Sequence, residues 1–171
     1  MRTSDDIAGQ GEAVHNQSGD GFARLVGGAA LLTGDAKQAC IDFCEQNAQI
    51  VMSCLPISLA VLAGGAGFTT MLDVVIVYGG RRVYLPTREN RFHAQSGIIV
   101  PAAAYAQWRS QSDGNGQIDV PSVWGLFLAL RKAAILFALG KKWPSDEMHT
   151  TFGMSRRQLR SFRAEPGAPI G

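Results

Sequence analysis

The sequence is poor in the side chains on which most catalytic sites depend. Its only histidines are His15, His93 and His149. None of them belongs to a metalloprotease, nucleophile-elbow or cysteine–histidine signature. The sequence therefore does not predict an enzyme.

Cysteine is equally scarce, and its spacing does not predict a metal site. Cys40 and Cys44 stand four residues apart on an expected helix, and Cys54 is the third cysteine. Without histidines or a second cysteine pair beside them, three thiols do not complete a zinc set. We expect small buried side chains here, and no metal or cofactor. The N-terminus has no apolar secretory core, so a reducing cytoplasm is the expected compartment.

Charged residues are absent between Gln46 and Leu72, which raises the alternative of a membrane segment. Pro56 and the glycines at 64, 65 and 67 interrupt this stretch. No part of it is a clean apolar run of the roughly 20 residues that a membrane span needs. We expect instead a helix that is broken at Pro56 and again at the glycines, is buried inside a dimer and has no membrane partner.

The sequence also lacks the end ligands of a calcium loop. Residues 111–122, QSDGNGQIDVPS, contain the middle of an EF-hand loop. Gln111 and Ser122, however, stand at the two positions where calcium requires carboxylates. We expect a glycine-rich turn between helices.

What the sequence does have is an uneven distribution of charge. The formal net charge of the 171 residues is only +2, yet residues 1–48 hold seven acids against three bases. Residues 131–163 hold eight bases against two acids. A basic end on a nearly neutral chain indicates a local anionic partner, and nucleic acid is the commonest one.

The pattern of apolar residues predicts a mainly α-helical protein with one short dimer-forming strand. We expect a disordered arm at residues 1–20, a helical dimerisation region at 21–119, a helix-turn-helix region at 120–165 and a flexible tail at 166–171. Helices are expected at residues 22–32, 35–54, 69–78, 101–110 and 120–139, and a short apolar strand at 98–100.

Residues 143–163 predict two short helices joined by a tight turn. Ser145 is placed to cap the first helix, and Gly153 to end it in a left-handed conformation. Ser155 then opens the second helix with Gln158 three residues on, which is the spacing of a capping box. One compact core can hold both helices, formed by Met148, Phe152, Met154, Leu159 and Phe162.

The second of these helices is strongly basic. A helix that is capped, lightly buried and basic suits entry into the major groove of DNA. An ordinary helical hairpin with a solvated basic face is the alternative. The expected DNA-binding residues are Ser155, Arg156, Arg157, Arg160 and Arg163, with Lys141 and Lys142 from the preceding helix end placed to reach phosphates.

The run that follows Gly79-Gly80 has strand propensity and is bounded by glycine and proline. A single short strand cannot satisfy its own backbone groups, and a two-fold copy of itself is the simplest partner. The expected dimerisation residues are Arg82, Val83, Tyr84 and Leu85.

Together, this strand and the C-terminal helices give the sequence a family resemblance. It resembles the Mor family of phage middle-operon transcription activators and their sister late activator C. The matching stretches are GGRRVYLP, residues 79–86, and SDEMHTTFGMSRRQLRSFR, residues 145–163. The resemblance implies a homodimer whose strands pair across the two-fold axis and help to position two helix-turn-helix units. Residues 87–119 depart from the family's pattern.

These observations predict a sequence-specific DNA-binding regulator of transcription that acts as a dimer in a bacterium, phage or mobile element. Activation of transcription rests on the resemblance alone, which also leaves RNA polymerase as a further partner. The alternative is a membrane-associated or protein-binding accessory protein that does not bind DNA.

Overall fold

The computed structural model describes residues 34–164, and within this range it confirms a mainly α-helical fold, to which it adds one small sheet. The expected arm at 1–20, the helix at 22–32 and the tail at 166–171 lie outside the described residues. In chain order the elements are α2 (Gly34–Gln46), α3 (Ala48–Cys54), α4 (Ile57–Tyr78), β1 (Arg82–Tyr84), α5 (Glu89–Ser96), α6 (Ala102–Arg109), β2 (Gln117–Asp119), α7 (Val123–Gly140), α8 (Ser145–Phe152) and α9 (Arg156–Ala164).

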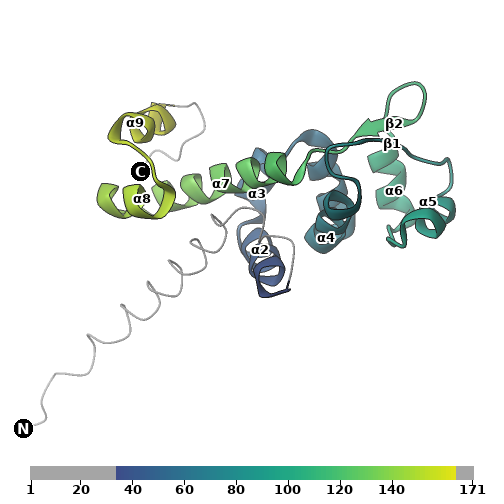
Figure 1. Ribbon diagram of the computed structural model, residues 1–171, viewed down its shortest axis with the longest axis horizontal. Coiled ribbons are helices and arrows are strands. Elements are labelled where there is room, and N and C mark those ends of the chain that lie inside the picture. Colours follow the sequence, from purple (N-terminus) through teal and green to yellow (C-terminus); the bar gives the residue numbers. More distant parts are fainter. Residues whose placement is uncertain (1–33, 165–171) are drawn as a thin grey trace, which may run out of the picture.

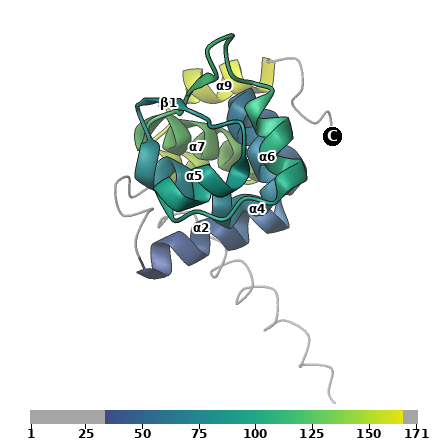
Figure 2. The same cartoon turned by 90° about the vertical axis from the view of Figure 1, so that its right-hand side faces the viewer.

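Helix α7 runs through the middle of the molecule and connects its two ends (Figure 1). The sheet lies at the N-terminal end of α7 together with α5 and α6, and α8 and α9 lie at the C-terminal end. Seen from the sheet end, α5 and α6 stand in front of α7 (Figure 2). The short sheet and the basic C-terminal helices are therefore far apart in the structure.

The helix expected at residues 35–54 is split in two at Asn47. The amide group of the Asn47 side chain donates a hydrogen bond to the carbonyl oxygen of Phe43 at 3.0 Å, and α3 begins at the next residue. An asparagine side chain that competes for backbone groups in this way favours a helix end over a helix interior. Cys40 and Cys44 are buried as expected, whereas Cys54 is only partly buried.

Helix α4 confirms the two expected breaks in the uncharged stretch. It begins directly after Pro56, and Gly67 interrupts it with φ 86° and ψ 164°. Gly65 permits a close approach to α6, because a Cβ atom added there would lie 2.7 Å from the Cβ of Ala104. The helix ends at Tyr78, before the glycine pair, where the sequence predicts its end.

The expectation of one strand without a partner in the chain is wrong, because β1 pairs with β2. The two strands are antiparallel, with Val83 opposite Ile118. The segment expected to be a turn between helices thus supplies a turn and a strand. The strand expected at residues 98–100 is also wrong: this segment has no strand partner, although Ile98 and Val100 are buried.

The turn before β2 is organised by Asp113. One carboxylate oxygen, Oδ1, accepts hydrogen bonds from the backbone N–H groups of Asn115 at 2.9 Å and Gln117 at 2.8 Å. The other oxygen, Oδ2, pairs with the guanidinium group of Arg82 on β1. Both carboxylate oxygens of Asp113 therefore have partners within the protein, and the ion pair with Arg82 connects the turn to β1.

A single apolar core runs across the expected boundary between residues 119 and 120. Near the sheet, the ring of Phe92 lies between those of Tyr78 and Tyr105, at centroid distances of 5.9 and 5.5 Å. Towards the other end, Phe43 of α2 contacts Phe137 of α7 edge-on. The same core continues through Trp143 into α8.

Two of the described helices, α4 and α7, are long and apolar enough to cross a membrane by length and composition. In each, 39% of the most apolar window is buried inside the protein. Core helices of soluble proteins have the same properties, so these two helices are weak evidence for the membrane alternative.

Candidate nucleic-acid interface

Helices α8 and α9 are held together by the apolar residues that the sequence predicts. Met148, Phe152, Met154 and Leu159 are buried, and Phe162 packs against them while partly exposed. Trp143 adds a further buried ring, 6.3 Å from that of Phe152. Burial of these side chains fixes α9 on α8 and α8 on the end of α7.

The turn between the two helices begins with Gly153, which is left-handed as predicted. Its φ is 61° and its ψ is 27°. A residue with a Cβ atom is strained in this region by roughly 1 kcal/mol or more. The glycine lets the chain leave α8 and start α9 three residues later.

The predicted capping box at the start of α9 is present in full. The backbone N–H of Gln158 donates to the Ser155 hydroxyl oxygen at 3.2 Å, and the backbone N–H of Ser155 donates to the Gln158 side-chain oxygen at 2.8 Å. Two backbone donors that a helix N-terminus leaves free are satisfied in this way. Ser155 is thus a structural residue of the helix start.

Ser145, in contrast, does not cap α8. The residue at the N-cap is Pro144, whose carbonyl oxygen accepts the first helical hydrogen bond, from Met148 at 3.0 Å. Lys142 lies in a turn with φ 57°, and Trp143 after it enters the core. This tight path brings the extended backbone of Pro144 to the capping position and moves Ser145 into the helix.

Two side chains that the sequence does not single out as structural hold the end of α8. The guanidinium group of Arg131, on α7, donates to the carbonyl oxygen of Phe152 at 2.5 Å. Nδ1 of His149 lies 2.7 Å from the carbonyl oxygen of Met154, across the turn. An arginine near a basic helix is a candidate phosphate contact, but the Arg131 side chain is partly buried and donates to the Phe152 carbonyl oxygen instead.

The exposed side of α9 is basic. Arg156, Arg157 and Arg160 are exposed, and no ion pair joins any of them to a described acidic residue. Among these three side chains, Arg160 makes one long hydrogen bond of 3.5 Å, from its Nε to the Arg156 carbonyl oxygen. Arg163 belongs to the same helix, but its side chain lies outside the described residues.

The two lysines before α8 occupy different environments. Lys141 places its ammonium group 5.7 Å from the centre of the Phe137 ring, which is a cation–π contact. Lys142 is exposed at the left-handed turn. The segment between α7 and α8 holds both lysines, and it lies at the same end of the molecule as α9 (Figure 1).

The four residues expected to form a dimer lie at the opposite end. Val83 of β1 is paired within the chain, and Leu85 is buried and donates its N–H to the carbonyl oxygen of Gly116 at 2.8 Å. Arg82 pairs with Asp113, and Tyr84 is exposed. The intrachain partner removes the reason for which a second copy was expected at this strand.

Comparisons with known proteins give no relative for this chain. No protein-family model, no curated protein and no solved structure matches it.

Proposed function

We propose that this protein binds double-stranded DNA through helix α9 and regulates transcription as an activator. The proposal rests on α9, which exposes three arginines. A complete capping box starts this helix, and a buried apolar core fixes it on α8. Helix-turn-helix proteins place a helix of this kind in the major groove. The resemblance to the Mor family supports the same function and is the reason for proposing activation.

The roles of the basic residues follow from their positions. Arg157 and Arg160 stand three residues apart and so share one side of α9, where a guanidinium group can make two hydrogen bonds to a guanine. Arg156, Lys141 and Lys142 are then phosphate contacts that position the helix. No step of this function requires an enzyme, a metal or a cofactor.

The test is binding of the purified protein to duplex DNA from the region flanking its own gene, compared with random duplex DNA. Arg157→Ala is expected to weaken binding to the preferred site more than to random DNA, because a bidentate guanine contact gives about 1–3 kcal/mol of discrimination. The matched control is Arg81→Ala, which removes the same charge from an exposed position at the sheet end. Equal losses in both variants would mean that Arg157 contributes only charge. No DNA binding by the unaltered protein at low salt would refute the proposal.

The proposal includes a homodimer, since two half-site contacts strengthen each other through their effective concentration. Val83 is paired with Ile118 of β2, the N–H of Leu85 donates to Gly116 just before β2, and bonding alternates along an antiparallel ladder. The backbone groups of Arg82 and Tyr84 therefore face the open edge of β1, which is where a second copy can still add. Sedimentation at micromolar concentration tests this part separately.

A membrane-associated protein is the second candidate, and α4 and α7 are the observation that favours it. It predicts partition into the membrane fraction of expressing cells and no retardation of duplex DNA. A protein that remains in the soluble fraction without detergent and binds DNA is inconsistent with this second function.

A further inference from the structure

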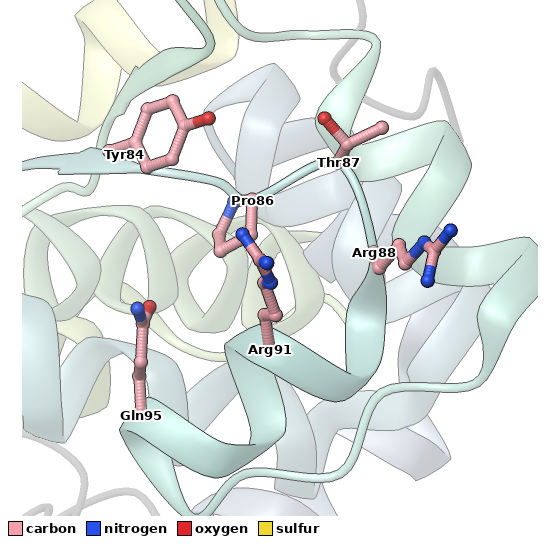
Figure 3. Close-up of a pocket in the computed structure, with 6 residues that line it drawn as sticks. All are labelled: Tyr84, Pro86, Thr87, Arg88, Arg91 and Gln95. Atoms are coloured by element: carbon pink, nitrogen blue, oxygen red, sulfur yellow. The ribbon is translucent and has the colours of Figure 1, made fainter.

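A hollow lies at the sheet end of the molecule, where β1 leads into α5 (Figure 3). Its volume is about 390 Å³, which falls in the range of roughly 300–1,000 Å³ typical of small-molecule sites. It is separated from α9 by the length of α7 (Figure 1). The residues that line it are Tyr84, Pro86, Thr87, Arg88, Arg91 and Gln95.

The lining carries two positive charges and no negative charge. No ion pair or hydrogen bond joins the guanidinium group of Arg88 or Arg91 to another described residue. Arg82 and Arg109, on neighbouring elements, do have partners within the chain. Arg88 and Arg91 thus differ from their neighbours in having full hydrogen-bonding capacity for an anion from outside.

The backbone wall of the hollow is fixed from the side of α6. The carbonyl oxygen of Leu85 accepts a hydrogen bond from Nε of Arg109 at 3.2 Å, and that of Pro86 accepts one from the Tyr105 hydroxyl at 2.8 Å. Burial raises the pKa of Tyr105 to about 12, so its hydroxyl keeps the proton that it donates. Two carbonyl oxygens that would repel an anion are engaged from within the protein.

An aromatic ring forms another part of the wall. Tyr84 is 55% exposed, yet its position is supported from below by Gly116, where an added Cβ atom would lie 3.1 Å from the ring. Gly116 has φ 74°, which disfavours any residue with a side chain. The ring of Tyr84 therefore lies close to the turn before β2, and more than half of the residue is exposed.

The side chains of α5 converge on this wall. Arg91 and Gln95 stand four residues apart and extend from the helix towards the segment of Tyr84 and Pro86, whereas the side chain of Arg88 points away from Arg91 (Figure 3). Arg88 is the N-cap residue of α5 and makes no side-chain cap hydrogen bond. The positive end of the helix dipole adds to the charge of the two arginines, and the carboxylate of Glu89 in the first turn opposes it from outside the lining.

We propose that this hollow is a binding site for a small organic phosphate. The phosphate group lies against Arg91 and the first turn of α5, with Arg88 at the rim. The organic part of the ligand lies against the ring of Tyr84 and against Pro86. Phosphate matches the positive charge of this lining, and an arginine such as Arg91 binds it with two parallel hydrogen bonds.

Calorimetric titration of the whole protein at constant ionic strength tests this site. The probes are adenosine monophosphate, adenosine and inorganic phosphate. We expect the monophosphate to bind more tightly than inorganic phosphate, and adenosine to bind at least tenfold more weakly. Arg91→Gln should weaken the monophosphate by about tenfold or more, as loss of a charge-assisted hydrogen bond does. Arg81→Gln, an equal loss of charge at an exposed position that does not line the hollow, should leave it unchanged.

Several results would overturn the inference. If Arg81→Gln weakened the binding of adenosine monophosphate as much as Arg91→Gln does, the general positive charge of the sheet end would explain the binding. If inorganic phosphate bound as tightly as the monophosphate, Tyr84 and Pro86 would not contribute to ligand binding. Absence of binding by both phosphates at millimolar concentration would remove the site altogether. If neither phosphate bound and Arg91→Gln weakened DNA binding, the two arginines would instead contact the phosphates of a nucleic acid. Circular dichroism shows in each case that the variants are folded.

Discussion

The guanidinium group of Arg131 on α7 donates a hydrogen bond to the carbonyl oxygen of Phe152, the last residue of α8, at 2.5 Å. The last carbonyl groups of a helix have no partner within that helix. Arg131 supplies one from the neighbouring helix, next to the glycine that starts the turn. The end of α8, and with it the start of α9, is therefore tied to the central helix of the fold.

Replacing Arg131 by Met should lower the free energy of unfolding by about 1 kcal/mol, since it removes a partly exposed charge-assisted hydrogen bond. Urea denaturation without DNA measures this loss. DNA affinity should fall as well, because α9 is no longer held in one orientation. Arg131→Lys keeps the charge without the planar guanidinium group. Full recovery of both properties in Arg131→Lys would show that only the charge of this residue matters.

Gly153 should tolerate asparagine far better than valine. Asparagine adopts the left-handed conformation at small cost, whereas a β-branched residue is strongly strained there. No described atom lies within 4 Å of an added Cβ atom, so the backbone and not a collision decides the outcome. Gly153→Val should abolish DNA binding with most of the helical circular dichroism retained, and Gly153→Asn should bind. Equal affinity of the two variants would contradict this account of the turn.

The capping box should behave as a coupled pair. Ser155→Ala and Gln158→Ala should each destabilise the C-terminal helices by about 0.5–2 kcal/mol, as loss of a helix cap does. The double variant should cost less than the sum, because each single change already disrupts the shared arrangement. Hydrogen exchange of the α9 amides measures the effect locally. Additive costs would indicate that the two hydrogen bonds act independently.

The local features of the candidate interface could be predicted because their determinants lie within a few residues of each other. The helix-ending Gly153 can be recognised from the sequence alone, and so can the spacing of Ser155 and Gln158. The buried set from Met148 to Leu159 follows from helical spacing in the same way. The path into α8 was not predicted, because it depends on where Trp143 meets the core and not on the local preference of Ser145.

The sheet could not be predicted by the same reasoning. Val83 and Ile118 are paired across a long stretch of chain, and nothing near either residue identifies the other. Short strands also carry little periodic signal. The turn chemistry was visible in the DGNG sequence, since aspartate and glycine favour tight turns. What the sequence could not reveal is that the turn would bring β2 back to β1 and pair Asp113 with Arg82.

That pairing predicts a dependence of stability on pH. The pKa of the Asp113 carboxyl lies below its usual value, chiefly because the backbone N–H of Gln117 donates to it. The backbone N–H of Asn115 and the guanidinium group of Arg82 lower the pKa further. A carboxyl group whose pKa is lower in the folded state stabilises the fold above its unfolded pKa of about 3.9. The stabilisation disappears as the pH falls through the lower folded pKa.

Asp113→Asn should therefore be less stable than the unaltered protein at pH 7, and the gap should narrow at pH 3. Urea midpoints of both proteins at pH 7, 5 and 3 measure it. Asp119→Asn is the matched control, because Asp119 loses the same charge from the exposed face of β2 without an ion pair to a described residue. Its midpoint should follow that of the unaltered protein over the whole range. A constant gap between Asp113→Asn and the unaltered protein from pH 7 to pH 3 would show that the charge of Asp113 does not stabilise the turn, and that the asparagine is disfavoured there for reasons of geometry alone.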